Sequence, residues 1–249
     1  MVESATSAAT PAAHPAATRA SPPALCIAIV GAESTGKTSL AASLAQRLAV
    51  DTRRRVAWVS EALRDWCEQA GRTPHAHEQA PILRAQHERI DAALAAHEIV
   101  VCDTTALMTA VYSHLIFNDR SLEERAALLH RRSVSLTLLT ALDLPWVSDG
   151  LQRDGPHVRE PVDTALRSLM QAHGIAYSVV GGAGDARLQQ AIAALAPLLR
   201  SDASAPGPAG LFTGLGSADA RRRAWSCECC LPDEERALRR LAPSAERAQ

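Results

Sequence analysis

Short apolar runs alternate with amphipathic segments through the middle of the chain. The runs that predict strands are 24–30, 56–60, 99–102, 134–141 and 175–180. Their apolarity is continuous rather than alternating, which is typical of strands buried on both faces of a parallel sheet. The segments that predict helices are 37–49, 61–70, 78–96, 105–117, 121–131, 161–173 and 185–200. We therefore expect an α/β fold, with a doubly wound five-stranded parallel sheet flanked by helices.

Composition changes at both ends of this pattern. Residues 1–23 are rich in Ala, Pro, Ser and Thr and predict a disordered leader. Residues 24–200 form the expected α/β domain, and the Pro, Gly and Ser content of 201–218 predicts a linker. Residues 219–249 form a charged tail that contains Cys227, Cys229 and Cys230. Three thiolates this close suggest either a metal site, for which no fourth ligand is evident, a redox-active pair, or an unspecialised tail.

Charge and hydropathy exclude several classes of function. A formal net charge of −1 gives no global reason to bind nucleic acid or an anionic membrane. No apolar stretch approaches the ~20 residues that span a bilayer, and the leader lacks the features of a signal peptide. Six cysteines do not make a disulfide framework, and Cys26 and Cys102 lie in apolar runs where buried thiols are expected. We therefore expect a cytoplasmic protein.

The segment GAESTGKT at 31–38 fits the phosphate-binding pattern G-x-x-x-x-G-K-[ST] at every fixed position. A predicted strand precedes it and a predicted helix follows, as a P-loop requires. In such a loop, backbone N–H groups surround the phosphates, the lysine reaches the β- and γ-phosphates, and the threonine hydroxyl binds Mg²⁺. The predicted ATP-binding residues are Gly31, Ala32, Glu33, Ser34, Thr35, Gly36, Lys37, Thr38 and Ser39.

The lysine of this motif is the only lysine in the chain, since Lys37 accounts for one of the 26 basic residues and arginine for the others. A chance glycine-containing turn is the alternative interpretation of the segment. Arginine replaces lysine readily on a solvated surface but poorly against phosphates under a closely wrapped backbone. The retention of lysine at this one position therefore favours a working nucleotide site.

Three charged residues follow predicted strands at the edge where ligands collect in open α/β sheets. Asp103 comes directly after the run at 99–102 and is placed to bind Mg²⁺ together with Thr38. The alternative is a cap of the next helix, a role compatible with metal binding. Glu61 and Arg64 follow the run at 56–60. Glu61 is the preferred general base, with Asp103 as the alternative, and Arg64 would orient the acceptor. The competing interpretation of Glu61 is a first-turn carboxylate stabilised by the helix dipole.

The polar segment from 143 to 160 contains two arginines, Arg153 and Arg159, among turn-forming residues. Kinases of small molecules use mobile, arginine-bearing lids to exclude water and to spread positive charge over the transferring phosphoryl group. A solvated surface loop is the alternative. Arg187 lies beyond the last predicted strand and is either a neighbour of the adenine or a surface arginine.

Four segments together resemble the ribosylnicotinamide kinase domain of NadR-type proteins, over about residues 25–199. They are GAESTGKTSL at 31–40, the E-x-x-R-D pattern at 61–65, VVCDTT at 100–105 and LPWVSDGLQR at 144–153. The first is generic to P-loop proteins, whereas the second and the last are more particular. The chain departs from the family at Gln152, where the lid arginine is usual and where Arg153 is the next residue.

This resemblance implies a P-loop kinase that phosphorylates the 5′-hydroxyl of nicotinamide riboside with ATP and Mg²⁺, giving nicotinamide mononucleotide. Trp146 and Asp149, in the W-x-x-D-G stretch, join Glu61, Arg64 and Asp103 as the expected substrate-binding residues. Periodicity alone does not choose among nucleoside-like acceptors. The remaining alternative is a P-loop module whose nucleotide state controls contact with a partner.

Overall fold

The computed structural model describes residues 24–147 and 155–202, with only the backbone of 201 and 202. Within these ranges, five strands form one sheet: β1 (Leu25–Val30), β2 (Val56–Val59), β3 (Ile99–Asp103), β4 (Leu136–Thr140) and β5 (Ser178–Val180). Their order is β2-β3-β1-β4-β5, and all four neighbouring pairs are parallel. The predicted five-stranded parallel sheet is therefore confirmed.

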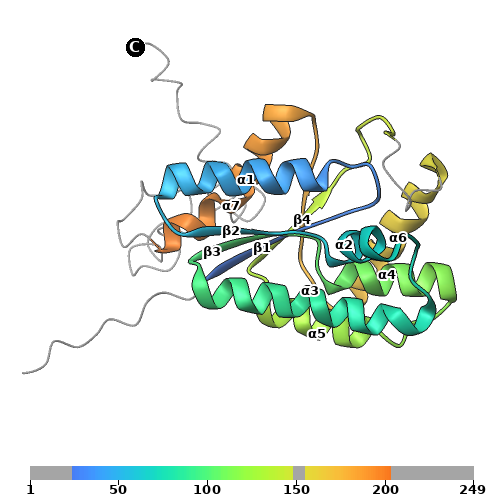
Figure 1. The fold of residues 1–249 in the computed structure, drawn as a ribbon. Helices are drawn as coiled ribbons and strands as arrows, with labels where there is room; N and C mark the ends of the chain where they lie inside the picture. Colours follow the sequence, from blue (N-terminus) through green and yellow to red (C-terminus); the bar gives the residue numbers. More distant parts are fainter. Residues whose placement is uncertain (1–23, 148–154, 203–249) are drawn as a thin grey trace, which may run out of the picture. The chain divides into compact units, whose positions relative to one another are not determined.

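Helices cover both faces of this sheet (Figure 1). They are α1 (Lys37–Thr52), α2 (Ala62–Ala70), α3 (Ala76–Ala96), α4 (Ala106–Phe117), α5 (Glu123–Ser133), the short 3₁₀ helix η2 (Pro156–Val158), α6 (Arg159–Ala172) and α7 (Gly184–Asp202). Apolar residues of α1 and α7 pack with Ile27 and Ile29 on one face. Residues of α3, α4, α5 and α6 pack with Val30 and Leu139 on the other. The central strand is thus buried on both faces, as its continuous apolarity predicted.

The topology brings the chain segments that follow four strands to one edge of the sheet. Strand β1 lies between β3 and β4, so the connections from β1 to β2 and from β3 to β4 leave the centre in opposite directions. In open α/β sheets, such a switch point opens a crevice beyond the carboxyl ends of the strands. The loops that begin at Gly31, Ser60, Thr104 and Ala141 meet there. This is the edge on which the sequence placed its candidate residues.

The last strand is shorter than predicted, because Ile175 belongs to the cap of the preceding helix and residues 176 and 177 lie in neither element. His173 caps α6 and Gly174 is left-handed, with a φ of +63°. The N–H of Ile175 donates to the carbonyl of Met170 at 2.8 Å, and that of Gly174 donates to the carbonyl of Gln171 at 3.2 Å. These two bonds form a Schellman motif, in which an apolar residue packs back onto the last turn. The apolar Ile175 therefore belongs to the end of a helix, and the strand begins at Ser178.

Similar reasons shorten the strand predicted at 134–141. The N–H of Val134 still donates to the carbonyl of His130 at 2.8 Å, so this residue ends α5 instead of starting β4. The expected loop from 143 to 160 is also shorter than predicted, since α6 begins at Arg159. Apart from one or two residues at most ends, and three extra residues at the end of α1, the other predicted elements are present.

Several expectations concern residues outside the described ranges. They are the leader at 1–23, nearly all of the linker at 201–218, and the tail at 219–249 with its three cysteines; α7 includes the first two linker positions. Within the described ranges, Cys26 and Cys102 are buried free thiols whose sulfur atoms lie 3.6 Å apart. None of the helices that the structure describes is long and apolar enough to cross a membrane.

Candidate functional site

The P-loop occupies the turn between β1 and α1, in the context that the motif requires. Gly31 leaves the strand with a φ of +149°, and a Cβ at this position would lie 2.1 Å from Oγ1 of Thr140. Gly36 has a φ of +74° and is the N-cap of α1. Glycine is needed at the first position by both conformation and space, and at the second chiefly by conformation. The structure therefore explains why the motif has glycine at both positions.

The loop presents the groups that bind an anion. No side chain caps the N-terminus of α1, where backbone N–H groups and the helix dipole favour negative charge. The Lys37 side chain is only 6% exposed, and its Nζ donates to the carbonyl of Ala32 at 2.8 Å. The ammonium thus folds back over the loop, on the side that phosphates would occupy. Ser39 is exposed in the first turn of α1.

Thr38 and Asp103 meet across 65 residues of sequence. The Thr38 hydroxyl donates to Oδ2 of Asp103 at 2.6 Å, while Oδ1 of Asp103 is buried with no partner among the described residues. The helix that follows Asp103 is capped by Thr105, which accepts from the N–H of Leu107. Asp103 is therefore not the cap of α4, which was the alternative interpretation of this residue.

A hydroxyl beside a carboxylate with one unpaired oxygen fits Mg²⁺, a cation that takes oxygen ligands from few protein groups and the rest from water and phosphates. No group of three or more His, Cys, Asp or Glu side chains in the described part of the chain is arranged to hold a metal ion. A cation at Thr38 and Asp103 would therefore depend on the nucleotide for further ligands.

Glu61 and Arg64 reach this pair from the start of α2. Arg64 Nη1 donates to the Thr38 hydroxyl at 3.1 Å, and its Nη2 lies 3.5 Å from Oε2 of Glu61. Glu61 is the N-cap residue of α2, yet its side chain makes no cap hydrogen bond. The carboxylate therefore lies beside the arginine that contacts Thr38 of the P-loop, and it does not cap its own helix by a hydrogen bond.

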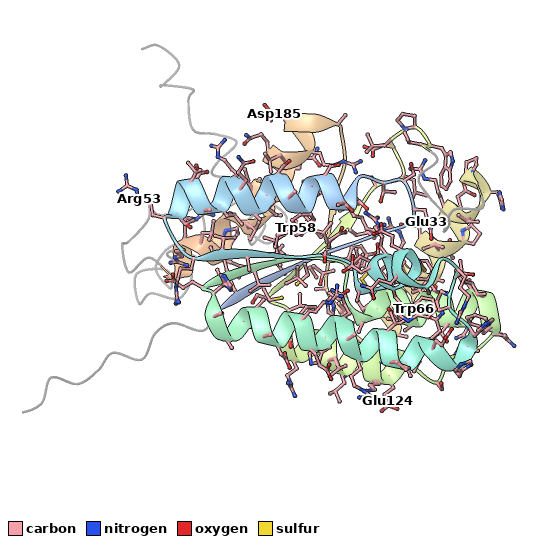
Figure 2. All side chains as sticks on the ribbon, in the orientation of Figure 1. Glu33, Arg53, Trp58, Trp66, Glu124 and Asp185 are labelled. Carbon is pink, nitrogen blue, oxygen red and sulfur yellow. The ribbon has the colours of Figure 1, made fainter. Side chains whose placement is uncertain are left out.

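Burial raises the pKa of Glu61, and the carboxylates of Asp103 and Glu33 raise it further, against the opposing charges of Lys37 and Arg64. Glu33 is 9% exposed, and its Oε2 has no partner within the described ranges. Figure 2 shows Glu33 at the end of α1 that lies beside α2. A buried carboxylate with a raised pKa, next to a phosphate loop, is suited to accept a proton.

The segment that follows β4 lies against the P-loop. The N–H of Val147 donates to the Ser34 hydroxyl at 2.7 Å, and Leu144 lies close to Gly36. Trp146 directly precedes Val147 in the chain and is half-buried. Asp149 and Arg153, two further predicted site residues, lie outside the described residues.

Arg159 differs from its predicted setting in a loop. It is the first residue of α6 and is 8% exposed. Its Nη1 donates to the carbonyl of Leu144 at 2.8 Å, whereas Nε and Nη2 are buried with no partner among the residues described. A solvated surface loop does not describe this arginine, because buried donors without partners are costly unless a ligand completes them.

Arg187 is also not on the surface, since only 3% of it is exposed. Its guanidinium contacts the carbonyls of Thr35 and Gly182 and the carboxylate of Asp143. The surface alternative is therefore wrong. Two of these partners, Asp143 and Thr35, are 44 and 152 residues away in the sequence, so a pattern of neighbouring residues does not reveal the burial of Arg187.

Three residues at the site were not identified from the sequence. Gln86 accepts from the N–H of Ala62 at 2.6 Å and donates to the carbonyl of Ser60 at 3.3 Å, so it fixes the turn that carries Glu61. Its position on the apolar face of α3, in register with Leu83 and Ile90, is the signal that would have indicated it. Thr140, whose hydroxyl bonds Thr35 at 2.7 Å, and Asp143 carried no comparable signal.

Comparison with known proteins places the chain in a family. The family model described as AAA domain matches residues 26–187, about two thirds of the chain. No curated protein matches the sequence.

Solved structures of other proteins share the fold. A NadR protein in complex with NR has a TM-score of 0.59 at 21% identity, and a NadR protein in complex with NAD and AMP-PNP has 0.57 at 19%. Each match covers 70% of this chain and about half of the NadR chain (51% and 49%). The thymidylate kinase of Ehrlichia chaffeensis has a TM-score of 0.50 at 15% identity, with 70% of this chain and 100% of that chain covered. The resemblance to NadR is thereby confirmed for the fold, and the chain belongs to the AAA domain family, with a nucleotide-binding P-loop fold like those of NadR and thymidylate kinase.

Proposed function

We propose that the protein transfers the γ-phosphoryl group of ATP to a hydroxyl of a nucleoside-like molecule, and that this molecule is nicotinamide riboside. The observation that carries the proposal is the position of Glu61. Its carboxylate is buried and has a raised pKa. The Arg64 side chain lies between this carboxylate and the Thr38 hydroxyl and contacts both. Transfer of a phosphoryl group to a hydroxyl uses a proton acceptor at this place, whereas binding of a nucleotide alone requires none.

The nucleotide half of the site would be formed by the P-loop. The loop amides and Lys37 would hold the β- and γ-phosphates, while Thr38 and Asp103 would hold Mg²⁺, which supplies charge neutralisation when bound. Arg159, with two buried donors unpartnered among the described residues, would contact a phosphate oxygen or the acceptor. Arg153 is proposed to approach the transferring group, because it is one of the two arginines of the polar segment from 143 to 160.

The acceptor half would be formed by the start of α2 and the segment after β4. Arg64 would orient the acceptor and Glu61 would accept its proton, with Trp146 and Asp149 as further contacts. The hydroxyl oxygen forms a bond to the γ-phosphorus as the bond between that phosphorus and the bridging oxygen of the β-phosphate breaks. ADP leaves, and the hydroxyl proton passes to the Glu61 carboxylate.

Two observations support nicotinamide riboside as the acceptor. The E-x-x-R-D and W-x-x-D-G patterns resemble the ribosylnicotinamide kinase domain, and a NadR protein with bound NR shares the fold. In addition, the carboxylates of Glu33 and Glu61 are both buried at the site. They would attract the cationic nicotinamide ring and repel an anionic acceptor.

The second candidate is a nucleoside monophosphate kinase, which the match to the whole length of a thymidylate kinase favours. Such an acceptor brings two negative charges, which the carboxylates at the site oppose.

Single-turnover product analysis distinguishes these functions. Purified full-length protein is mixed with radiolabelled ATP, Mg²⁺ and one acceptor at a time: nicotinamide riboside, thymidine or thymidine monophosphate. We expect nicotinamide mononucleotide as the main product. If thymidine monophosphate yields thymidine diphosphate and nicotinamide riboside yields no product, the protein is a nucleoside monophosphate kinase and the proposed acceptor is wrong.

Lys37 provides an independent measure of nucleotide binding, because the chain has no other lysine. An acyl-phosphate derivative of ATP should modify Lys37 and the N-terminal amine, and excess ATP should protect Lys37. Protection without any product from the three acceptors would favour the regulatory P-loop module over the kinase.

A further inference from the structure

The guanidinium of Arg187 joins three segments of the chain behind the P-loop. Nε donates to the carbonyl of Gly182 at 2.8 Å, Nη1 donates to the carbonyl of Thr35, and Nη2 donates to Oδ1 of Asp143. Thr35 lies in the P-loop, Gly182 in the turn after β5 and Asp143 in the segment after β4. Each of the three nitrogen atoms thus has a protein acceptor, and almost none of the side chain is exposed.

The contact with Thr35 determines the direction of an amide in the loop. The carbonyl of Thr35 and the N–H of Gly36 belong to the same peptide unit, which is planar and trans. In such a unit the C=O and N–H bonds point in opposite directions. Because Arg187 holds the carbonyl outward, the N–H of Gly36 is directed away from Arg187, toward the side of the loop where the phosphates bind.

Asp143 fixes the guanidinium in turn. Its other carboxylate oxygen, Oδ2, accepts from the N–H of Gly182, so the same aspartate contacts both Arg187 and the turn after β5. A planar guanidinium can make these three bonds at once, whereas the ammonium of a lysine cannot reproduce their geometry. Burial lowers the pKa of Arg187 and the Asp143 carboxylate opposes that effect, which keeps the charge paired.

We propose that Arg187 and Asp143 are positioning residues that hold the Thr35–Gly36 peptide in its phosphate-binding orientation, without contacting the nucleotide. The proposal rests on the binding of a triphosphate by the P-loop, but not on the identity of the acceptor. It assigns Arg187 a role in nucleotide binding that differs from contact with the adenine. The two roles predict different results for a ligand that has phosphates and no base.

The test compares the binding of ATP and of inorganic tripolyphosphate, each with Mg²⁺, by isothermal titration calorimetry on the full chain. Arg187→Gln and Asp143→Ala should each weaken both ligands by a similar factor of about 10 to 100, the value of a hydrogen bond to a charged group. The double variant should lose little more than either single variant, because the two residues act as a unit.

Arg167→Gln is the matched control. Arg167 is also an arginine paired with an aspartate, Asp163, at 2.6 Å, but both lie on α6, and among the described residues the other hydrogen-bond partner of Arg167 is Tyr177 instead of a P-loop residue. This variant should bind both ligands as the wild type does. Far-UV circular dichroism checks that each variant is folded, and Arg187→Lys, which retains the charge and most of the side chain, should show the same loss as Arg187→Gln.

Two results would overturn the proposal. If Arg187→Gln weakens ATP and leaves tripolyphosphate unchanged, Arg187 contacts the base instead. If Arg187→Gln, Arg187→Lys and Asp143→Ala all bind both ligands as tightly as the wild type, the orientation of the peptide does not depend on the pair. Failure of the wild type to bind either ligand would instead contradict the proposed function, and with it the positioning role of Arg187 and Asp143.

Discussion

The P-loop has an inner side, which faces Asp103, Glu33 and Glu61, and an outer side, which faces Arg187 and Thr140. Both sides carry polar side chains that are buried, but the two sides differ in whether the protein supplies hydrogen-bond partners for them. On the inner side, Oδ1 of Asp103 and Oε2 of Glu33 have no partner within the described ranges, and burial raises the pKa of Glu61. On the outer side, every nitrogen of the Arg187 guanidinium contacts a protein acceptor, and Thr140 bonds Thr35.

This difference separates groups kept for a ligand from groups that maintain shape. A buried polar atom without a partner costs free energy, and such atoms are retained where a ligand supplies the missing bond. A network in which every polar atom already has a partner in the protein offers no hydrogen bond to a ligand, and it fixes the conformation of the backbone instead. Substitutions on the inner side should therefore lower activity with little loss of stability, whereas those on the outer side should lower the free energy of unfolding.

Lys37→Ala tests the inner side most strongly. We expect a loss of about 10³–10⁵ in single-turnover rate, comparable to the removal of other cations that stabilise a transferring phosphoryl group. The melting temperature should stay the same or rise, because a buried ammonium is removed. Rapid-quench kinetics and thermal unfolding measure the two effects. A large fall in melting temperature would mean that Lys37 maintains the conformation of the loop, as the residues on the outer side do.

Glu61→Gln should lower the rate by about 10²–10⁴, the usual contribution of a general base. The wild-type rate should rise with pH as Glu61 loses its proton, and the midpoint should lie above the ordinary glutamate pKa of 4.5 because burial raises the pKa of this carboxyl. The Gln variant should lack this limb of the pH–rate profile.

Glu78→Gln is the control for this experiment. Glu78 bonds Arg72 at the start of α3, and this bond lowers the pKa of Glu78 to about 2. Its rate and pH profile should match those of the wild type. A limb that persists in Glu61→Gln would identify a different base, with Asp103 as the remaining candidate.

Gly31→Ala tests the outer side. Its Cβ would lie 2.1 Å from Oγ1 of Thr140, at a φ of +149°. Backbone strain of about 1–3 kcal/mol and overpacking of about 1–3 kcal/mol should together lower the free energy of unfolding by about 2–6 kcal/mol. Urea denaturation measures this loss.

Gly71→Ala separates strain from crowding. Gly71 has a φ of +66° and no atom within 4 Å of an added Cβ, so only strain of about 1–2 kcal/mol is expected. Equal losses in the two variants would show that contact with Thr140 does not constrain the loop.

His130 extends the comparison to a saturated cluster away from the P-loop. Its Nδ1 bonds Thr105 at 3.0 Å and its Nε2 bonds Thr137 at 2.8 Å. Burial lowers the pKa of His130 from 6.5 to about 4. Because the folded state binds the proton more weakly, His130 should favour folding above pH 6.5, and this contribution should fall as the pH decreases toward 4.

The difference between the two pKa values of His130, 6.5 and about 4, corresponds to a contribution of about 3 kcal/mol at most to the free energy of unfolding. Free energies of unfolding measured from pH 7 to 4 should converge for the wild type and His130→Gln. Parallel curves would mean that the histidine is already protonated, or solvated, in the folded protein.

The agreement between sequence and structure depends on how local the determining interactions are. The P-loop lies within eight consecutive residues, and its conformation follows from two glycines and a flanking strand and helix. Asp103 could be placed because the end of a buried strand is visible in the sequence and the carboxyl ends of parallel strands meet at one edge. The start of β5 is three residues later than predicted, because Ile175 is apolar for packing at a helix cap, and apolarity alone does not distinguish this from a strand.

The sequence by itself determined the parallel sheet and the phosphate-loop motif with its single lysine, since each follows from residues close together in the chain. Only the tertiary structure decided which face of the loop each charged residue serves. Glu61 faces the inner side although it begins a helix, and Arg187 lies behind the loop, 152 residues from its partner Thr35. The reason is physical: whether a buried charge is left for a ligand or is satisfied by the protein depends on partners that folding brings together from distant segments.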